Sequence, residues 1–387
     1  MTPGARVAAA IEILDDILAG VVPEKALTGW GRSHRFAGSK DRAAIRDNVF
    51  SALRCRASFA WLGGAETGRG IMLGAMRSAG LADEMFSGEG HAPAVAQDEE
   101  QGQTLDTAPR SVRLDMPDWL LPHFDAALEE DTEIVLTQLQ ERAGIFLRVN
   151  LARTTVSDAA DRLRADGIET TPLLHISSAL QVIGNERKIA QSSAYLDGLV
   201  ELQDTASQDA IEKLGITPNL RVLDYCAGGG GKSLAMAALG AHISAHDIDA
   251  RRMKDIAPRA KRAGCAIDIL TTDELKQTAP FDLVFCDAPC SGSGTWRRTP
   301  AAKWDLTPDR LDELTRMQLD VLNAAKSYVR VGGTLAYATC SVFEVENSDR
   351  VEAFLKHAPQ FAFESDYHFT PHSHGDGFYL STLQRVT

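Results

Sequence analysis

The sequence has few cysteines, and they are not arranged as a disulfide framework or a zinc site. The six cysteines are Cys55, Cys226, Cys265, Cys286, Cys290 and Cys340. No C-x-x-C pair occurs among them, which is typical of a reducing compartment and indicates no metal cluster. No stretch approaches the roughly 18 uninterrupted apolar residues of a membrane span, and the amino terminus lacks a signal-peptide layout. We therefore expect a cytoplasmic protein that binds neither a metal ion nor a membrane.

Positive charge is also scarce, because the formal net charge of the 387 residues is −13. The deficit is local. Residues 83–133 hold 14 acidic residues against Arg110 and Arg113, so the rest of the chain is almost neutral. Residues 251–262 carry six basic residues, and a second basic cluster with aromatic residues covers 296–304. Since local patches decide contact with phosphates, the acidic total does not exclude RNA as a partner.

The length and the residue patterns predict several domains. A chain this long exceeds the size of a single core. Residues 1–86 have apolar residues at helical spacing, as in Val7, Ile11 and Leu14, and we predict an all-α domain. Residues 87–110 read as an acidic flexible linker, and 111–205 as a small α+β segment with a strand near 145–150. Residues 206–387 complete the chain.

This last region alternates strands and helices. Strand patterns occur at 221–224, 243–247, 266–270, 281–287 and 334–339, with helical stretches between them. Such alternation predicts a doubly wound α/β domain with a parallel sheet, which is a Rossmann-like fold. The final alternation at 377–383 predicts an added antiparallel edge strand.

The first of these strands runs into a glycine-rich loop at residues 224–233. A P-loop would need glycine at position 226, where Cys226 stands. A dinucleotide-binding fingerprint would need glycine at position 233, where Ser233 stands. Asp247 ends the next strand, where a carboxylate can bind both ribose hydroxyls, and Asp273 follows the third strand near an expected adenine. A glycine turn with a ribose acid but no pyrophosphate motif fits S-adenosylmethionine. The predicted cofactor-binding residues are Cys226, Ala227, Gly228, Gly229, Gly230, Gly231, Lys232, Asp247, Asp273 and Asp287.

Two cysteines stand at the carboxyl ends of strand patterns. Cys290 follows the 281–287 strand in Asp-Ala-Pro-Cys, and Cys340 follows the 334–339 strand in Ala-Thr-Cys-Ser. A thiolate is well suited to reversible addition to an electron-poor ring carbon, and two at one sheet edge supply an attacking group and a helper. An isolated cysteine more often fills a core. We assign that packing role to Cys55, Cys226, Cys265 and Cys286.

With these motifs in their order, the chain resembles the Sun/RsmB family of RNA cytosine-5 methyltransferases. The matching segments are 222–232, 287–294, 297–300, 303–304, 337–341, 346–347 and 377–379. Residues 38–62 resemble the family's NusB-like helical domain, and the resemblance implies that this domain binds RNA. One departure is that Gly228 and Gly229 replace Ala-Pro in the cofactor loop, which should make the loop more costly to order.

The resemblance implies roles for three residues. Cys340 would be the nucleophile that adds to carbon 6 of cytosine, Cys290 would assist release of the methylated base, and Asp287 would hold the cytosine edge. Lys232 and Arg297 are candidates for the positive field that favours a thiolate. By analogy, Trp296, Arg298 and the 251–262 cluster would contact RNA.

Several interpretations stay open. The favoured one is an S-adenosylmethionine-dependent enzyme forming 5-methylcytosine in 16S ribosomal RNA, active as a monomer. Transfer RNA is an alternative substrate. A DNA cytosine-5 methyltransferase would use Cys290 as its nucleophile, and a non-catalytic RNA-binding or ribosome assembly protein would need neither thiol. His175, His368, His372 and His374 are expected at the surface, and His246 in the core or in a helix cap.

Overall fold

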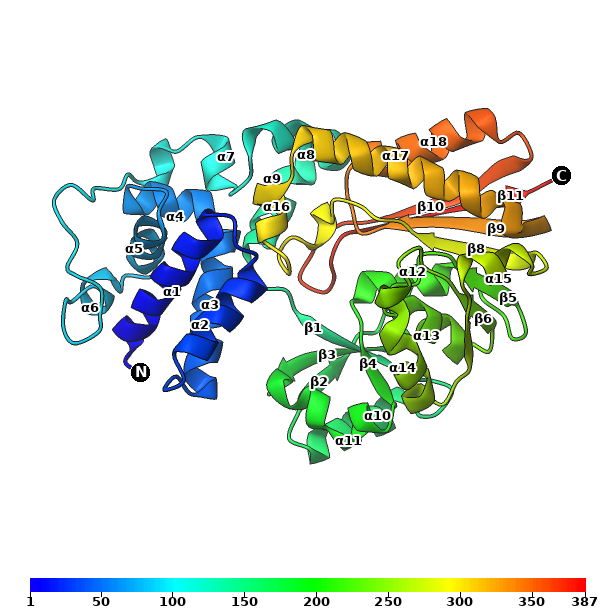
Figure 1. Ribbon diagram of the computed structural model, residues 1–387, viewed down its shortest axis with the longest axis horizontal. Helices are drawn as coiled ribbons and strands as arrows, with labels where there is room; N and C mark the ends of the chain where they lie inside the picture. The colour runs from blue at the N-terminus through cyan, green and yellow to red at the C-terminus, as the bar shows by residue number, and fades with distance from the viewer. The chain divides into compact units, whose positions relative to one another are not determined.

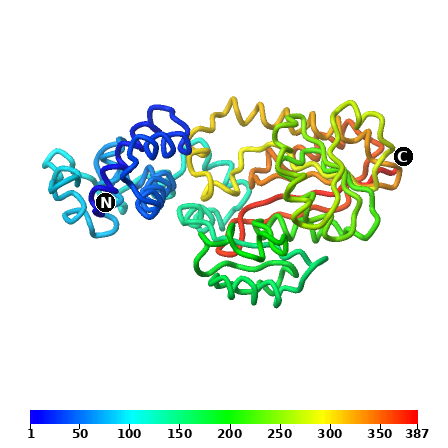
Figure 2. Tube along the Cα trace, turned by 60° about the horizontal axis from the view of Figure 1, so that its bottom comes forward, coloured from blue at the N-terminus to red at the C-terminus, as the bar shows by residue number.

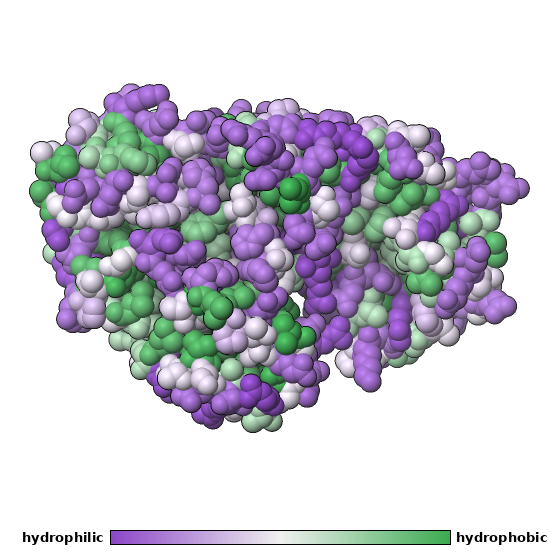
Figure 3. Space-filling model, turned by 180° about the vertical axis from the view of Figure 1, so that it is seen from behind, coloured by the Kyte–Doolittle hydropathy of each residue, from purple (hydrophilic) through white to green (hydrophobic).

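The computed structural model describes residues 1–387 and divides into two compact units. The first comprises Met1–Arg142 and Trp296–Asp305, and the second comprises Ala143–Thr295 and Leu306–Thr387. None of the helices is both long and apolar enough to cross a bilayer. On the face drawn in Figure 3, apolar residues occur as scattered patches among hydrophilic ones.

The first unit is all-helical (Figure 1). Its helices are α1 (Pro3–Leu18), α2 (Pro23–Ser33), α3 (Ser39–Arg54), α4 (Arg56–Gly63), α5 (Gly68–Ser78), α6 (Ala82–Met85), α7 (Arg110–Arg113), α8 (Leu121–Leu128), α9 (Thr132–Gln140) and α16 (Ala301–Asp305). Thr2 caps α1 by accepting a hydrogen bond from the Ala5 amide, and Pro3 occupies the first turn. The predicted helical spacing is confirmed, because Val7 and Leu14 are buried in one core.

Helices α4 and α5 pack with their backbones in close approach. A Cβ atom at Gly63 would lie 1.8 Å from the Gly70 carbonyl oxygen, and one at Gly74 would lie 1.8 Å from that of Phe59. Glycine is therefore required at this crossing. Residues 87–104 form no helix or strand, and an ion pair of 2.5 Å joins Glu100 to Arg69 on α5. Both ends of the segment expected to be a linker lie in the first unit.

The chain returns to the first unit at residues 296–305, where polar side chains fasten α16 to the end of α3. The Lys303 ammonium donates a hydrogen bond of 2.7 Å to the Arg54 carbonyl oxygen, and the Trp304 indole donates one of 2.8 Å to that of Leu53. Arg54 in turn donates to the Arg297 carbonyl oxygen at 2.7 Å. Lys303 is 1% exposed, so these contacts are internal.

The second unit begins with a four-stranded antiparallel sheet, which forms a compact green group in the trace of Figure 2. Its strands are β1 (Ile145–Val149), β2 (Glu169–Pro172), β3 (Ala179–Gly184) and β4 (Val200–Leu202), in the order β2-β3-β1-β4. Helices α10 (Val156–Ala165) and α11 (Ser193–Leu196) accompany it. The strand expected near 145–150 is confirmed by β1.

A seven-stranded sheet forms the rest of the second unit, and the predicted Rossmann-like fold is confirmed. Its strands are β5 (Arg221–Asp224), β6 (His242–Ala245), β7 (Ile267–Ile269), β8 (Phe281–Asp287), β9 (Val329–Thr339), β10 (Phe361–Phe369) and β11 (Phe378–Arg385). The order is β10-β11-β9-β8-β5-β6-β7, and the chain order reverses between β5 and β8. Ligands of such sheets bind at this reversal, outside the carboxyl ends of the strands.

Helices cover both faces of this sheet. Helices α17 (Pro308–Ala325) and α18 (Ser348–His357) lie along one face, and α12 (Thr205–Lys213), α13 (Gly231–Ala238) and α14 (Ile256–Ala263) along the other (Figure 1). The short α15 (Thr272–Lys276) precedes β8. One prediction was wrong. Strand β11 is antiparallel as expected, but it lies between β9 and β10, and the edge strand is β10.

Candidate functional site

The two motif cysteines meet at the carboxyl edge of the large sheet. Strands β8 and β9 are parallel neighbours, with Asp287 opposite Ala338. Cys290 and Cys340 therefore leave the sheet at the same edge, and their sulfur atoms lie 3.4 Å apart in a hydrogen bond. Both thiols are partly exposed. This geometry places two sulfur nucleophiles beside one another at an accessible position.

The surroundings make the two thiols unequal. The hydrogen bond from Cys290 lowers the pKa of Cys340, and the Lys232 charge and the Thr295 hydroxyl lower it further against the opposing effects of burial and Asp287. The same hydrogen bond raises the pKa of Cys290, as does burial. These directions favour ionisation of Cys340 over ionisation of Cys290.

A buried carboxylate holds the two cysteine loops together. Glu346 is 0% exposed. It accepts hydrogen bonds from the Ser291 amide at 2.8 Å and from the Ser291 and Ser341 hydroxyls at 2.5 Å each. Gln318 of α17 donates a further bond of 3.0 Å. Since each serine directly follows one motif cysteine, Glu346 fixes the separation of the thiols.

Asp287 and Lys232 form an ion pair next to the thiols. The Lys232 ammonium lies 2.7 Å from the Asp287 carboxylate, and their side chains are 17% and 31% exposed. Lys232 comes from the first turn of α13 and Asp287 from the last residue of β8. The predicted positive field at Cys340 is supplied by Lys232. Arg297, the other candidate, is buried in the first unit.

The glycine-rich loop borders a cavity of about 280 Å³, whose lining includes Asp224, Cys226, Gly228, Gly229, Lys232 and Asp287. Gly228 has a φ of +50°, in the left-handed region that favours glycine. The structure therefore brings most of the predicted cofactor loop to one hollow, next to the residues of the cysteine site.

Asp224 has an unpaired oxygen in this lining. It is 1% exposed, and its Oδ2 accepts a hydrogen bond of 2.5 Å from the Ser233 hydroxyl. Its Oδ1 is buried and has no hydrogen-bond partner. Burial raises the pKa of this carboxyl to about 7. A buried acceptor without a partner is costly, so the position suits a ligand with an ammonium or amide donor.

The two acids expected to bind the nucleoside differ in placement. Asp247 is buried behind the loop and accepts hydrogen bonds of 3.0 Å from the amides of Gly228 and Asp249. Arg252 pairs with it at 3.1 Å. Asp273 lies in the first turn of α15, where its side chain is 88% exposed and pairs with Lys276. Neither Asp247 nor Asp273 is among the residues that line the cavity, although Arg252, which pairs with Asp247, is.

Most of the basic 251–262 cluster is already paired with acids of its own unit. Ion pairs join Arg251 to Asp249, Arg252 to Asp247, and both Arg259 and Arg262 to Glu201. Arg259 also donates to the Gly229 carbonyl oxygen. This cluster therefore braces the cofactor loop, and it is less available to RNA than the sequence suggests.

Burial decides several other candidates. Trp296 is 1% exposed and packs edge-on against Phe124, so it has no free face for a base. Arg298 is exposed. His246 is buried and bonds the Tyr225 carbonyl and the Thr272 hydroxyl, in agreement with a core role. The four remaining histidines considered, His175, His368, His372 and His374, are exposed as predicted.

The other cysteines differ from the motif pair. Burial raises the pKa of Cys55 to about 12, and it also raises the pKa of Cys226, Cys265 and Cys286. A thiol with a raised pKa is a poor nucleophile at neutral pH. Their surroundings agree with the packing role.

Two site residues were missed from the sequence as participants in the site. Asp224 ends a strand pattern and has no predicted role, although a carboxylate directly before a glycine-rich turn is a usable signal. Glu346 lies in a segment that resembles the family, and the sequence predicts no role for it. No local pattern could show that it reaches Ser291, which is 55 positions away.

Comparison with known proteins identifies the family. The model described as "16S rRNA methyltransferase RsmB/F" matches residues 212–384, and "Methyltr_RsmF/B-like, ferredoxin-like domain" matches residues 116–187. Among solved structures, that of PH0851 superposes with a TM-score of 0.77 at 24% identity, covering 99% of each chain. NSun6 from Pyrococcus horikoshii, solved with SFG, has a TM-score of 0.62 at 17% identity, covering 70% of this chain and 98% of that one. These likenesses show the fold.

Curated relatives extend the match. "Ribosomal RNA small subunit methyltransferase B" of Photorhabdus laumondii is 30% identical over 247 residues, which are 62% of this chain and 57% of the relative. The protein of that name from Shewanella oneidensis is 30% identical over 291 residues, which are 70% of this chain and 67% of the relative. The matched part thus spans between a half and two thirds of these relatives' length. With the family model over its large sheet and these identities, the chain belongs to the RsmB/F methyltransferase family.

Proposed function

We propose that the protein methylates carbon 5 of a cytosine in 16S ribosomal RNA, with S-adenosylmethionine as the methyl donor. The observation that carries the proposal is the Cys290–Cys340 pair, with sulfur atoms 3.4 Å apart and the lower pKa on Cys340. Family membership and the names of the relatives support an RNA methyltransferase, and those names support the ribosomal small subunit as the substrate.

The residues of the loop cavity fit the cofactor. The unpaired Asp224 Oδ1 suits the ammonium group of its amino-acid part, and the glycines let a ligand approach the backbone closely. Asp247 would hold the ribose once Arg252 moves aside. When bound there, the cofactor supplies an electrophilic methyl group on a sulfonium.

The two thiols divide the reaction on the base. The Cys340 thiolate forms a bond to carbon 6 of cytosine, and the electron pair of the 5,6 double bond then makes carbon 5 nucleophilic. Carbon 5 would then accept the methyl group that the bound cofactor supplies. The carbon 5 proton would pass to solvent water with assistance from Cys290, the C–H electron pair would re-form the 5,6 double bond, and the bond from carbon 6 to Cys340 would break to return the thiolate. Asp287 holds the cytosine edge and supports protonation of the ring nitrogen while the adduct exists.

Single cysteine variants test these roles. We expect Cys340→Ala to abolish both methylation and the covalent protein–RNA adduct. Cys290→Ala should accumulate an adduct that survives denaturing electrophoresis, because the base is methylated but not released. Cys265→Ala is the matched control and should behave as wild type. An adduct that persists in Cys340→Ala and disappears in Cys290→Ala would reverse the roles and favour DNA-type chemistry.

The substrate is tested in cells. Bisulfite sequencing of 16S ribosomal RNA and transfer RNA from a strain lacking the gene should show one or more lost 5-methylcytosines in the 16S RNA. A loss confined to transfer RNA would refute the ribosomal substrate. No loss in any RNA, together with no adduct in vitro, would favour a non-catalytic assembly protein.

A further inference from the structure

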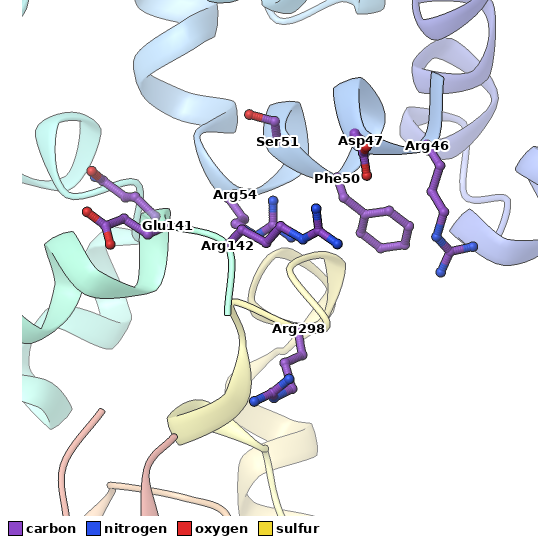
Figure 4. A pocket seen from close by; sticks show the side chains of 9 residues that line it. Arg46, Asp47, Phe50, Ser51, Arg54, Glu141, Arg142 and Arg298 are labelled. Carbon is purple, nitrogen blue, oxygen red and sulfur yellow. The ribbon is translucent and has the colours of Figure 1, made fainter. Parts of the chain in front are cut away.

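The first unit contains a pocket lined by arginine side chains, separate from the cysteine site of the second unit. The pocket has a volume of about 560 Å³, and its arginines are Arg46, Arg54, Arg142 and Arg298. Figure 4 shows these side chains extending from helix α3, from the residues after α9 and from the loop before α16. All the lining residues belong to the first unit.

The spacing on α3 explains how one helix contributes a basic face. Arg46, Phe50 and Arg54 recur every four residues, so their side chains project from one side of the helix. The Arg46 guanidinium stacks over the Phe50 ring at 4.8 Å from its centroid. No ion pair or hydrogen bond engages the Arg46 side chain. A guanidinium attracted to an aromatic ring by a cation–π interaction still has N–H groups that can bind an anion.

The charges in the pocket do not balance. Four guanidinium groups face two carboxylates, Asp47 and Glu141. Burial lowers the pKa of Arg54, and the like charge of Arg142 lowers it further. Arg46, Arg142 and Arg298 are exposed. An anion among these groups would relieve the repulsion between Arg54 and Arg142.

We infer that this pocket, which we call the arginine pocket, binds the phosphodiester backbone of the RNA substrate. A phosphate accepts two parallel hydrogen bonds from a guanidinium, which favours arginine over lysine at such sites. Several arginines from different segments match a chain of phosphates better than a single carboxylate. The exposed Arg46 side chain beside the buried Phe50 ring offers a surface for a ribose or a base. The inference rests on the proposed function, because it concerns that enzyme's substrate.

The basic cluster at 251–262 provides a contrast inside the same chain. Four of its six basic side chains are already paired with Asp247, Asp249 or Glu201. Arg46, which has no such partner, and the surplus of arginine over acid in the arginine pocket make this site the stronger candidate for RNA contact. The distribution of charge along the sequence alone would favour the other cluster.

The test measures binding of in-vitro transcribed, unmodified 16S ribosomal RNA to the full-length protein at several salt concentrations. For Arg46→Gln combined with Arg298→Gln, we expect about a tenfold loss of affinity near 0.15 M salt. The slope of log affinity against log salt should fall by about one to two, because each lost phosphate contact releases fewer counterions. Lys25→Gln, which removes one exposed charge from α2 of the same unit, is the control and should leave both quantities unchanged.

The outcomes separate this inference from the proposed function. Weaker RNA binding with unchanged S-adenosylmethionine affinity and an unchanged rate at saturating RNA supports the arginine pocket. Unchanged RNA affinity and slope in the double variant would overturn it while leaving the methyltransferase proposal intact. If polyglutamate displaces bound 16S ribosomal RNA from the wild-type protein more effectively than unlabelled RNA does, the inference is overturned in favour of an acidic protein partner. Arg46→Lys and Arg298→Lys should recover part of the salt slope but not the full affinity.

Discussion

Both units of the molecule bury charged side chains, but they surround them differently. In the first unit, Lys303 is bonded to the Arg54 carbonyl, burial lowers its pKa to about 8, and burial raises the pKa of nearby Asp115 to about 6. In the second, Glu346 fixes two loops and Asp224 keeps one oxygen unpaired. The first arrangement joins segments of the chain. The second positions groups at an open sheet edge and leaves an acceptor for a ligand.

The hydrogen-bond partners of a buried charge indicate its role. Burying an ion costs free energy, so the groups that compensate this cost show which part of the molecule the ion stabilises. Asp115 accepts hydrogen bonds from the Ser58 amide and hydroxyl, and both belong to the helical core. Glu346 receives its bonds from residues adjacent to Cys290 and Cys340. We therefore expect substitutions of buried charges in the first unit to change stability. Substitutions of buried charges at the sheet edge should change turnover.

The largest effect is expected from Lys303, a buried charge that stabilises the first unit. Lys303→Met should lower the unfolding free energy of the first unit by about 3 to 5 kcal/mol, since Asp115 then stays buried without its positive neighbour. All five tryptophans lie in the first unit, so tryptophan fluorescence during urea unfolding reports on it alone.

A double variant provides the control. Asp115→Asn added to Lys303→Met should recover part of the loss, because no buried charge then lacks a counterion. Reduced turnover without any shift of the fluorescence transition would contradict the comparison, since Lys303 would then serve chemistry instead of packing.

The next effect concerns positioning. Glu346→Gln should reduce the methylation rate about 100-fold, because the amide cannot accept all the hydrogen bonds of the carboxylate and the thiols shift relative to one another. Glu344→Gln is the matched control, an exposed glutamate in the same turn. The rate should be compared with the pH dependence of thiol alkylation. A Cys340 that titrates as in wild type would show that Glu346 affects stability only.

Features that depend on residues close together in the sequence could be predicted, and features that depend on distant residues could not. Apolar spacing in residues 3–18 and the strand patterns at 221–224 and 281–287 are local signals, and the helix and strands form as predicted. The meeting of Cys290 and Cys340 was also predictable, because parallel strands end at the same sheet edge. The edge strand β10 was missed although Phe361, Phe363, Tyr367 and Phe369 stand at alternate positions.

Contacts between residues far apart in the sequence could not be predicted from local sequence patterns. Lys303 bonds a carbonyl 249 positions away, and no pattern near residue 303 shows that its ammonium would be buried there. The basic and aromatic residues at 296–304 therefore suggested RNA contacts, whereas Lys303 and Trp304 fasten α16 to α3. The same limit hid the pairing of Arg259 and Arg262 with Glu201.

A smaller effect is expected at the unpaired carboxylate. Asp224→Asn should weaken S-adenosylmethionine binding about tenfold near pH 8, since a charged hydrogen bond to the ammonium group is lost. The pKa of Asp224 is about 7, above its usual value, so the carboxyl is protonated below that pH. The difference in affinity between wild type and variant should therefore shrink from pH 8 to pH 6. Calorimetry measures it, and a pH-independent difference would mean that the ligand does not meet Asp224.

The smallest effect is expected on cofactor affinity, and it tests whether a ligand replaces Arg252 as the partner of Asp247. Arg252 is 58% exposed, and its pair with the buried Asp247 carboxylate is worth about 0 to 1 kcal/mol. If ribose hydroxyls replace Arg252, then Arg252→Gln should strengthen cofactor binding by at most about fivefold, because no ion pair has to break. Arg251→Gln, which loses only the exposed pair with Asp249, is the control and should bind as wild type. Weaker binding in Arg252→Gln would mean that this arginine contacts the cofactor itself. The sheet edge would then hold its ligand through a cation as well as through its carboxylates.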